Sequence, residues 1–240
     1  MKFDQVKKLH QKKYRQALGY CLVEGEHLIL ELQRAAEKNV TLQNSVLYVN
    51  DGYADWVSPF ETHVITDKQM AQLSDTQSPQ GIIARVPLAA WETNTHGREI
   101  AIYLHEVQDP GNLGTILRTL GWFGHFRCLL SPESVDPFNP KVIRASMGAI
   151  FHVPMELNVS IDQLANRFHS IGCLDLKGQS ITDPSFKQVD CYLFGNEARG
   201  IPRTALEKLN YRTFTIQGSG QIESLNLATA VNICAYERQR

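Results

Sequence analysis

Three stretches of this sequence share one form: a run rich in β-branched and aromatic residues passes through a polar, Gly- or Asn-containing turn into a helix. They span residues 100–118, 191–202 and 212–236. Strands that alternate with helices favour a parallel sheet covered on both faces. Ligands of such sheets bind beyond the carboxyl ends of the strands. Three polar turns at that edge therefore predict one shared site.

The rest of the second half of the sequence continues this alternation. Strands are predicted over residues 100–104, 126–130, 152–156, 170–174, 191–194 and 212–216. Helices are predicted over residues 113–123, 141–147, 161–168, 202–209 and 224–238. The pattern places the C-terminal domain in the α/β class with a parallel sheet.

The last of the three stretches is apolar on nearly every face of its predicted helix, Leu225 to Tyr236. Ser224 stands at the N-cap position, where its hydroxyl can accept a backbone N–H. A helix this apolar is buried in a core or against a partner chain. Asn226 and Asn232 lie within it, and buried amides need hydrogen-bond partners. The stretch is either a capped core helix or one wall of a site.

The other two stretches carry a candidate arginine and a candidate acid. The turn at residues 109–112 starts a helix, with Asn112 or an adjacent residue as its cap. On that helix Arg118 projects roughly 150° from the centre of the apolar stripe, as an ordinary surface arginine or a functional one. Glycines such as Gly195 flank Glu197 where the backbone must approach closely. Glu197 is either a surface acid of this turn or a hydrogen-bonding ligand.

The first 88 residues form a smaller α/β pattern of their own. Two helices are predicted before residue 38, with residues 21–27 between them, and a further helix is predicted over residues 67–73. The predicted strands cover residues 46–49, 63–66 and 81–86. Residues 89–98 are polar and rich in turn formers, so they are predicted to link domain 1–88 to domain 99–240.

The net charge of −1 is distributed unevenly. The first twenty residues form a basic arm that contains a single acid, Asp4. Its basic residues are Lys2, Lys7, Lys8, Lys12, Lys13 and Arg15. Such an arm can bind RNA phosphates even on a neutral protein, although a solvated helix face has the same pattern. Arg144 is a further candidate phosphate ligand or an ordinary helix-surface cation.

Missing patterns argue against several other function classes. The sequence has no phosphate-binding Gly-x-x-x-x-Gly-Lys-Ser/Thr loop and no Gly-x-Gly-x-x-Gly between a strand and a helix. No residues have metal-ligand spacing, and the five cysteines are scattered, so no metal site is expected. No apolar run reaches membrane-spanning length and no signal segment opens the chain, so a cytoplasmic protein is expected.

Together the three stretches resemble the motifs of the SpoU/TrmH family of RNA 2′-O-ribose methyltransferases, in the family's order over residues 99–240. The resemblance implies S-adenosylmethionine as cofactor, rRNA or tRNA as substrate, and a trefoil knot made by the C-terminal segment. It assigns catalytic roles to Asn112, Arg118, Glu197, Ser224 and Asn226. It assigns cofactor contacts to the backbone at Gly195, Ile216 and Leu225.

Arg118 matches the family's proposed base. A free guanidinium has a pKa above about 12, so a phosphate or carboxylate relay would have to take its proton, or the arginine only orients the ribose.

The segment Lys8–Arg15 followed by Leu22–Glu26 resembles the substrate-binding domain that precedes many of these methyltransferases and is similar to an RNA-binding ribosomal-protein fold. An α/β cap without an RNA role is the alternative. For the whole protein, the alternatives are a non-catalytic RNA-binding or assembly factor that keeps the fold, and another nucleotide-cofactor enzyme.

A homodimer is expected from the C-terminal helix. No later segment covers the outer face of residues 225–236, and residues 121–124 add a second bulky apolar surface. Two such surfaces can pair across a two-fold axis, and the family resemblance implies the same arrangement. A monomer whose own sheet covers both faces is the alternative.

Overall fold

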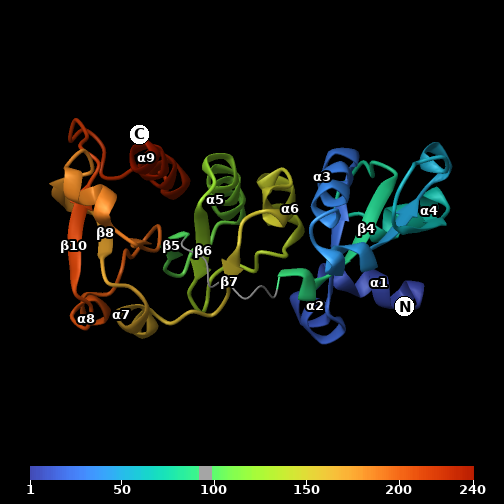
Figure 1. The fold of residues 1–240 in the computed structure, drawn as a ribbon. Coiled ribbons are helices and arrows are strands. Elements are labelled where there is room, and N and C mark those ends of the chain that lie inside the picture. The colour runs from blue at the N-terminus through green and yellow to red at the C-terminus, as the bar shows by residue number, and fades with distance from the viewer. Residues whose placement is uncertain (92–98) are drawn as a thin grey trace. The chain divides into compact units, whose positions relative to one another are not determined.

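The computed structural model describes residues 1–91 and 99–240, whose contacts divide them into two units (Figure 1). The first unit holds residues 1–91 with Asp136–His152, and the second holds residues 99–135 with Val153–Arg240. Most of the predicted linker at residues 89–98 lies outside the described residues, and the predicted domain boundary stays a prediction. The segment Asp136–His152, expected in the second domain, makes its contacts in the first unit.

The first unit is built on a mixed sheet with the strand order β1-β4-β2-β3. Its strands are β1 (Tyr20–Glu24), β2 (Val46–Val49), β3 (Glu61–Val64) and β4 (Ile82–Pro87). β4 is antiparallel to both β1 and β2, whereas β2 and β3 are parallel. The sequence pattern does not predict β1, because it places residues 21–27 in the connection between two helices. The buried residues of β1 show that tertiary packing against β4 decides this strand.

Short helices surround this sheet. They are α1 (Phe3–Lys7), α2 (Lys12–Leu18), α3 (Glu26–Ala36), α4 (Asp67–Leu73) and α6 (Pro140–Ser146). Single 3₁₀ turns are η1 (Lys8–His10), η2 (Val40–Asn44), η3 (Asp51–Tyr53), η4 (Leu88–Trp91) and η5 (Ala149–Phe151). The bounds of α4 confirm the predicted helix, and a capping box between Thr66 and Gln69 explains its start. One core cluster joins Leu9 to Leu22 and Met70.

The second unit contains a six-stranded sheet in the order β10-β8-β9-β5-β6-β7, and every pairing in it is parallel. The strands are β5 (Ile100–Leu104), β6 (Phe126–Leu130), β7 (Met155–Glu156), β8 (Ile171–Ser180), β9 (Cys191–Phe194) and β10 (Tyr211–Thr215). The predicted α/β class with a parallel sheet is therefore confirmed. β7 is shorter than predicted, because Pro154 precedes it and removes a backbone donor. β8 continues past residue 174 to Ser180.

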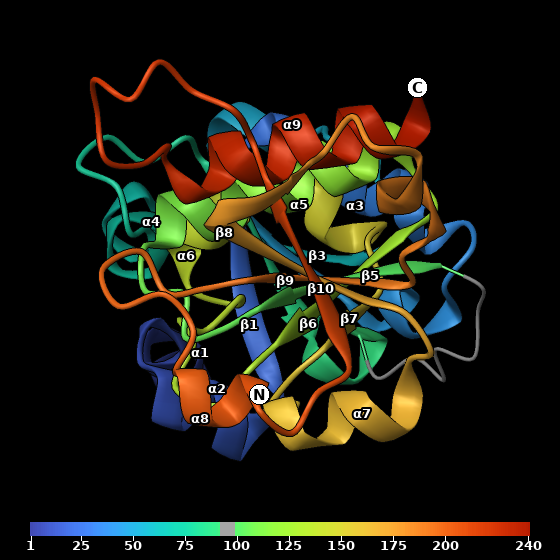
Figure 2. The same ribbon diagram turned by 90° about the vertical axis from the view of Figure 1, so that its left-hand side faces the viewer.

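Helices lie on both sides of this sheet, with α5 and α9 on one side and α7 and α8 on the other (Figure 2). The helices are α5 (Pro110–Phe123), α7 (Leu164–Arg167), α8 (Arg203–Leu206) and α9 (Leu227–Gln239), and the 3₁₀ turns are η6 (Ile161–Gln163) and η7 (Pro184–Gln188). On the α7 and α8 side, Tyr103 and Leu193 share a core cluster with Leu164 and Leu206. No helix among the described residues is long and apolar enough to cross a membrane.

The strand order brings two of the three candidate loops side by side. β5 pairs with β9, and both point the same way, so the loops that follow Leu104 and Phe194 leave from one edge of the sheet. β5 connects onward to β6 on one side, while β9 and β8 lie on the other, so this is a point where the strand order reverses. Ligands of α/β sheets bind at such points.

Candidate functional site

Three polar residues from the three stretches meet in one hydrogen-bonded chain. The side-chain amide of Asn226 donates to Oδ1 of Asn112 at 2.8 Å, and Nδ2 of Asn112 donates to Oε1 of Glu197 at 3.2 Å. The backbone N–H of Gln108 reaches the other carboxylate oxygen of Glu197 at 3.4 Å. All three of these hydrogen-bonded residues, Asn112, Glu197 and Asn226, are at least partly exposed. The fold therefore gathers three of the five predicted catalytic residues within reach of a ligand.

Helix capping places two members of this chain. Asp109 is the N-cap of α5, where its Oδ1 accepts the backbone N–H of Asn112 at 2.7 Å. Asn112 is thus on the first turn rather than at the cap, and its side chain is left to contact Glu197 and Asn226. The cap of α9 is Asn226, whose Oδ1 accepts the N–H of Thr229 at 3.2 Å.

The predicted cap of the last helix is wrong by two residues. α9 begins at Leu227, so Ser224 lies in the preceding loop with an exposed side chain. Asparagine is as good a cap as serine, and the hydrogen bond to Asn112 holds Asn226 at that position. Asn232 lies on the exposed face of α9, so it is not a buried amide.

Arg118 lies on α5 with an exposed side chain, as the helical spacing predicted. It makes no hydrogen bond or ion pair with the described residues. Six residues after Asn112, it is about 9 Å further along the helix and roughly 120° around its axis. Arg118 is therefore outside the Asn226–Asn112–Glu197 chain and free to contact another molecule.

The predicted cofactor contacts lie on two of these loops. Gly195 must be glycine, because a Cβ there would come within 2.5 Å of the Gly200 backbone. Ile216 directly follows β10 and is half-buried, while Leu225 is 43% exposed. Among the described residues, no backbone-to-backbone hydrogen bond involves residues 217–225. Apart from the Gln221 N–H, which donates to Ser219 Oγ at 3.4 Å, the loop presents backbone groups beside exposed apolar side chains, including Ile222 at 72% exposure.

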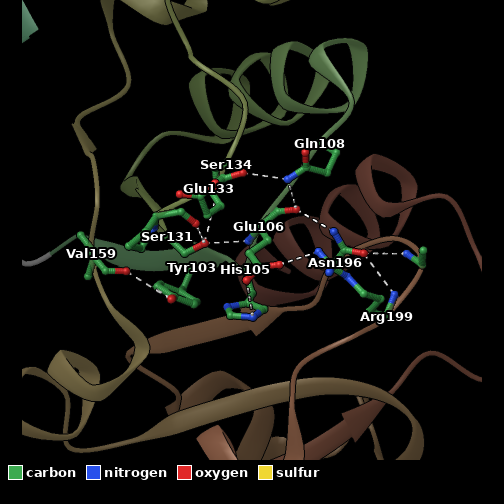
Figure 3. A network of polar contacts seen from close by, with 12 residues as sticks. Tyr103, His105, Glu106, Gln108, Ser131, Glu133, Ser134, Val159, Asn196 and Arg199 are labelled. Carbon is green, nitrogen blue, oxygen red and sulfur yellow. Dashed lines mark hydrogen bonds and ion pairs between the residues drawn. The ribbon is translucent and has the colours of Figure 1, made fainter.

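A second polar network, which the sequence did not predict, joins the loops after β5, β6 and β9 (Figure 3). Its centre is Glu106, whose backbone N–H donates to Ser131 Oγ at 2.7 Å. The Glu106 carbonyl accepts from Nδ2 of Asn196 at 2.7 Å, and its carboxylate pairs with Arg199 at 2.7 Å. Asn196 adjoins Gly195 in the turn, which is the signal that could have drawn attention to it.

His105 lies beside this network. Its ring is mostly buried, Nε2 is 3.7 Å from the Glu106 carboxylate, and Nδ1 is buried with no hydrogen-bond partner in residues 1–91 and 99–240. Burial lowers the pKa of His105, the Glu106 carboxylate raises it, and Arg199 lowers it further, with a net decrease. The neutral imidazole is therefore the favoured form near neutral pH.

The predicted RNA-binding residues differ in their surroundings. Lys8 and Lys13 hold their ammonium groups 5.4 and 4.8 Å from the centre of the Tyr14 ring. Lys7 pairs with Asp4 at 2.7 Å, and Lys12 is exposed. Arg144 forms an ion pair with Asp75 at 3.1 Å, both being about one-third exposed.

Arg15 does not belong to an exposed basic surface. It is only 3% exposed, its Nε donates to Asp136 at 3.1 Å, and its Nη2 pairs with the same carboxylate. Nη1 donates to the carbonyls of Leu9 and His10 at 2.9 and 2.8 Å. These contacts occupy the guanidinium inside the first unit. The prediction that Arg15 binds phosphate is therefore corrected: Arg15 has a structural role.

The described residues contain neither a cluster of metal ligands nor an exposed thiol. No group of three or more His, Cys, Asp or Glu among them could hold a metal ion. All five cysteines are buried. Burial raises the pKa of Cys128 to about 12 and that of Cys173, also next to Asp175, to about 12. A thiolate nucleophile is therefore disfavoured at neutral pH.

Comparisons with known proteins agree with this geometry. Residues 99–236 match the model of the SpoU rRNA Methylase family, and residues 2–84 match the MRM3-like substrate binding domain. The 23S rRNA (guanosine(2553)-2′-O)-methyltransferase RlmP of Bacillus subtilis is 30% identical over 96% of this chain and 92% of its own. An uncharacterized tRNA/rRNA methyltransferase of Synechocystis is 29% identical over 98% of this chain and 89% of its own.

Solved structures show the same fold. A TrmH-family protein from Porphyromonas gingivalis is 30% identical, with a TM-score of 0.84 over 99% of this chain and 96% of its own. The SpoU methyltransferase AviRb from Streptomyces viridochromogenes, solved with AdoMet, is 21% identical, with a TM-score of 0.82 over 99% of this chain and 96% of its own. With a family model that spans more than half of its residues, the chain belongs to the SpoU rRNA Methylase family.

Proposed function

We propose that the protein is an S-adenosylmethionine-dependent RNA methyltransferase that acts on a ribose 2′-hydroxyl. The observation that carries the proposal is the chain Asn226–Asn112–Glu197, built from three loops beside a reversal point of a parallel sheet. The similarity to a 23S rRNA 2′-O-methyltransferase along nearly the whole chain supports the reaction type. This similarity favours rRNA over tRNA as the substrate. The proposed compartment is the cytoplasm.

The reaction forms an O–CH₃ bond at the ribose, breaks an S–CH₃ bond in the donor and releases the hydroxyl proton. S-adenosylmethionine, when bound, supplies a methyl group that is already activated by its positively charged sulfur. The protein must orient the hydroxyl in line with that group and exclude water. The amides of Asn112 and Asn226 can donate to and accept from ribose hydroxyls, and the carboxylate of Glu197 can accept from them. Ser224, two residues before Asn226 in the same loop, has an exposed side chain whose hydroxyl is a further donor.

Arg118 has the proposed role of binding the ribose and its neighbouring phosphate. Its guanidinium keeps its proton at neutral pH, since its pKa lies above about 12. It can act as a base only if a phosphate or carboxylate takes that proton in the same step. A fixed positive charge beside the hydroxyl also stabilises the developing alkoxide. This stabilisation does not require the arginine to lose its proton.

The loops after β9 and β10 fit the proposed cofactor. The backbone groups of residues 217–225, which bond no other backbone group among the described residues, can bond the polar edges of a nucleoside, and the exposed Leu225 and Ile222 can cover its apolar faces. Gly195 and Ile216 lie at the starts of these two loops. The predicted contacts at Gly195, Ile216 and Leu225 are therefore retained as the proposed cofactor-binding residues.

For RNA binding, we propose the exposed lysines of the first unit. Lys8, Lys12 and Lys13 form no ion pair with an acid among the described residues, whereas Lys7 forms one with Asp4. Arg144 can contact RNA only by exchanging its partner Asp75. The similarity of residues 2–84 to a substrate binding domain supports an RNA-binding role for this unit.

A homodimer on α5 and α9 completes the proposal. These helices lie side by side (Figure 1), with Phe123 and Tyr236 in ring contact at 6.3 Å. Their outer surface exposes Trp122 by 85% and Tyr236 by 56%, large apolar areas for a lone chain to leave in water. A partner would cover both and bring its own α5, with a second Arg118, close to the site. A C-terminal trefoil knot, implied by the family resemblance, belongs to the same proposal.

Calorimetry with S-adenosylmethionine, followed by methylation of rRNA fragments, tests the function. The expected result is micromolar cofactor binding and a 2′-O-methyl nucleoside detected by mass spectrometry of the digested RNA. RNA binding without cofactor binding would instead support the non-catalytic assembly factor. Light scattering on the same sample tests the dimer, and an active species of single-chain mass would contradict it.

A further inference from the structure

The turn that carries Glu197 is held together by its neighbour Asn196, which is only 7% exposed. Oδ1 of Asn196 accepts the backbone N–H of Ala198 at 3.0 Å and that of Arg199 at 3.1 Å. The backbone of Asn196 also exchanges hydrogen bonds with Gly200, at 3.1 and 2.9 Å. These bonds close the turn on itself, so the direction in which Glu197 leaves it depends on Asn196.

The other end of the same amide reaches a different loop. Nδ2 of Asn196 donates to the carbonyl of Glu106 at 2.7 Å (Figure 3). Glu106 has a φ of 49°, a left-handed conformation that non-glycine residues adopt at some cost. Hydrogen bonds on both sides, from Asn196 to its carbonyl and from its N–H to Ser131, hold it there. Asn196 thus fixes the loop after β9 against the loop after β5.

The loop after β5 leads directly to the other partners of Glu197. Gln108 donates its side-chain amide to the Glu106 carbonyl at 3.0 Å and its backbone N–H to Glu197 at 3.4 Å. Asn112 follows on the first turn of α5. One buried amide therefore sets the spacing between Glu197 and both groups that bond it.

We infer that Asn196 is a positioning residue that holds the Glu197 carboxylate on Asn112 for the reaction. It acts through Glu197 and has no contact with substrate of its own. The role of Asn196 in turnover rests on the proposed function, whereas its effect on the turn does not. A misplacement of about 1 Å in a group that orients a substrate can cost about 100-fold in rate.

A double-mutant cycle in turnover tests the inference. Asn196→Ala should lower kcat by about 10- to 100-fold with an unchanged dissociation constant for S-adenosylmethionine. In a Glu197→Ala background, the same change should lower kcat by less than about twofold, because the group it positions is gone. An equal loss in both backgrounds, or full activity of Asn196→Ala, would overturn the inference.

Two further variants separate positioning from folding. Asn196→Asp keeps the acceptor for Ala198 and Arg199 but loses the donor to Glu106, so it should fold and still lose kcat. Ser131→Ala is the matched control, since Ser131 is 3% exposed and bonds Glu106 from the other side without touching the turn. It should lower the melting temperature with little change in kcat. A loss of kcat in Ser131→Ala equal to that in Asn196→Asp would contradict the assignment.

Amide hydrogen exchange gives a readout that does not need turnover. Asn196→Ala should speed exchange at Ala198 and Arg199 by about tenfold, the effect expected for one lost hydrogen bond. Ser131→Ala should leave both amides unchanged. If the wild-type protein were inactive, the proposed function would fail while this measurement still decided whether Asn196 holds the turn. Unchanged exchange in Asn196→Ala would overturn the inference.

Discussion

In the first unit Arg15 is buried against Asp136, whereas in the second unit Asn112, Glu197 and Asn226 bond one another at an accessible edge. Arg15 uses its donors on a carboxylate and two carbonyls inside the fold. The second group is not needed to fill a core, and its side chains can exchange a neighbour for a ligand. A strong polar pattern in a sequence can therefore serve packing in one unit and binding in the other.

Loss of the Arg118 side chain should give the largest effect of the variants below and sharpen this contrast. Arg118→Ala should lower methyl transfer by about 10²- to 10⁴-fold, the range for a group that acts in proton transfer or charge stabilisation. The melting temperature and cofactor affinity should stay near those of the wild type, because Arg118 contacts none of the described residues through its charge. A radiolabelled-methyl transfer assay measures the rate. Transfer at the wild-type rate would remove Arg118 from the mechanism.

Removal of Arg15 tests the other side of the comparison. Arg15→Met leaves Asp136 without its cation in a buried place, which should destabilise the first unit by about 3–5 kcal/mol. In a Trp122→Phe background, fluorescence of Trp56 and Trp91 during urea unfolding reports this unit, because both tryptophans lie in it.

The matched control removes both charges. Arg15→Met combined with Asp136→Leu should recover much of the lost stability, since no unpaired charge stays buried. Under conditions where the Arg15→Met protein is fully folded, its RNA affinity should equal that of the wild type. If the fully folded variant lost RNA affinity, Arg15 would be an RNA-binding residue, and the difference drawn between the two units would be wrong.

The lysines of the basic arm should have a moderate effect that depends on salt. Replacing Lys8, Lys12 and Lys13 with Gln should lower RNA affinity and reduce the slope of log K against log salt by roughly 0.7 for each lost phosphate contact. Lys7→Gln is the matched control with a smaller expected change, because Asp4 already neutralises Lys7. Filter binding at several salt concentrations measures the slope. An unchanged slope would indicate that these lysines only solvate a helix.

The smallest expected effect concerns pH. Burial lowers the folded-state pKa of His105 below 6.5, so the unfolded chain binds more protons in that range. Stability of the second unit should therefore rise with pH from the lowered pKa to about 6.5 and level off above it. His105→Gln should flatten this rise in unfolding measured between about pH 5 and 7. An unaltered pH dependence would show that another group titrates there.

Periodicity and the three polar turns were enough to predict the parallel α/β sheet, the bounds of β5, β6 and β9, and the exposed position of Arg118. These features depend on residues close in sequence, because a strand or helix face follows from side-chain spacing of two or 3.6 residues. The candidate residues Asn112, Glu197 and Asn226 were found through the motif resemblance. Their hydrogen bonds to one another were not predictable, since they link positions 85 and 114 residues apart.

Where competing local signals were nearly equal, only the tertiary structure decided. Ser224 and Asn226 are equally good caps, and the bond from Asn226 to Asn112 accompanies the choice of the second. Arg15 looks like its exposed lysine neighbours until Asp136, 121 residues away, is placed beside it. Asn196 carries no local signal for its bond to Glu106, 90 residues earlier. Sequence patterns determine which faces are apolar, but long-range pairing determines which polar groups stay free to bind.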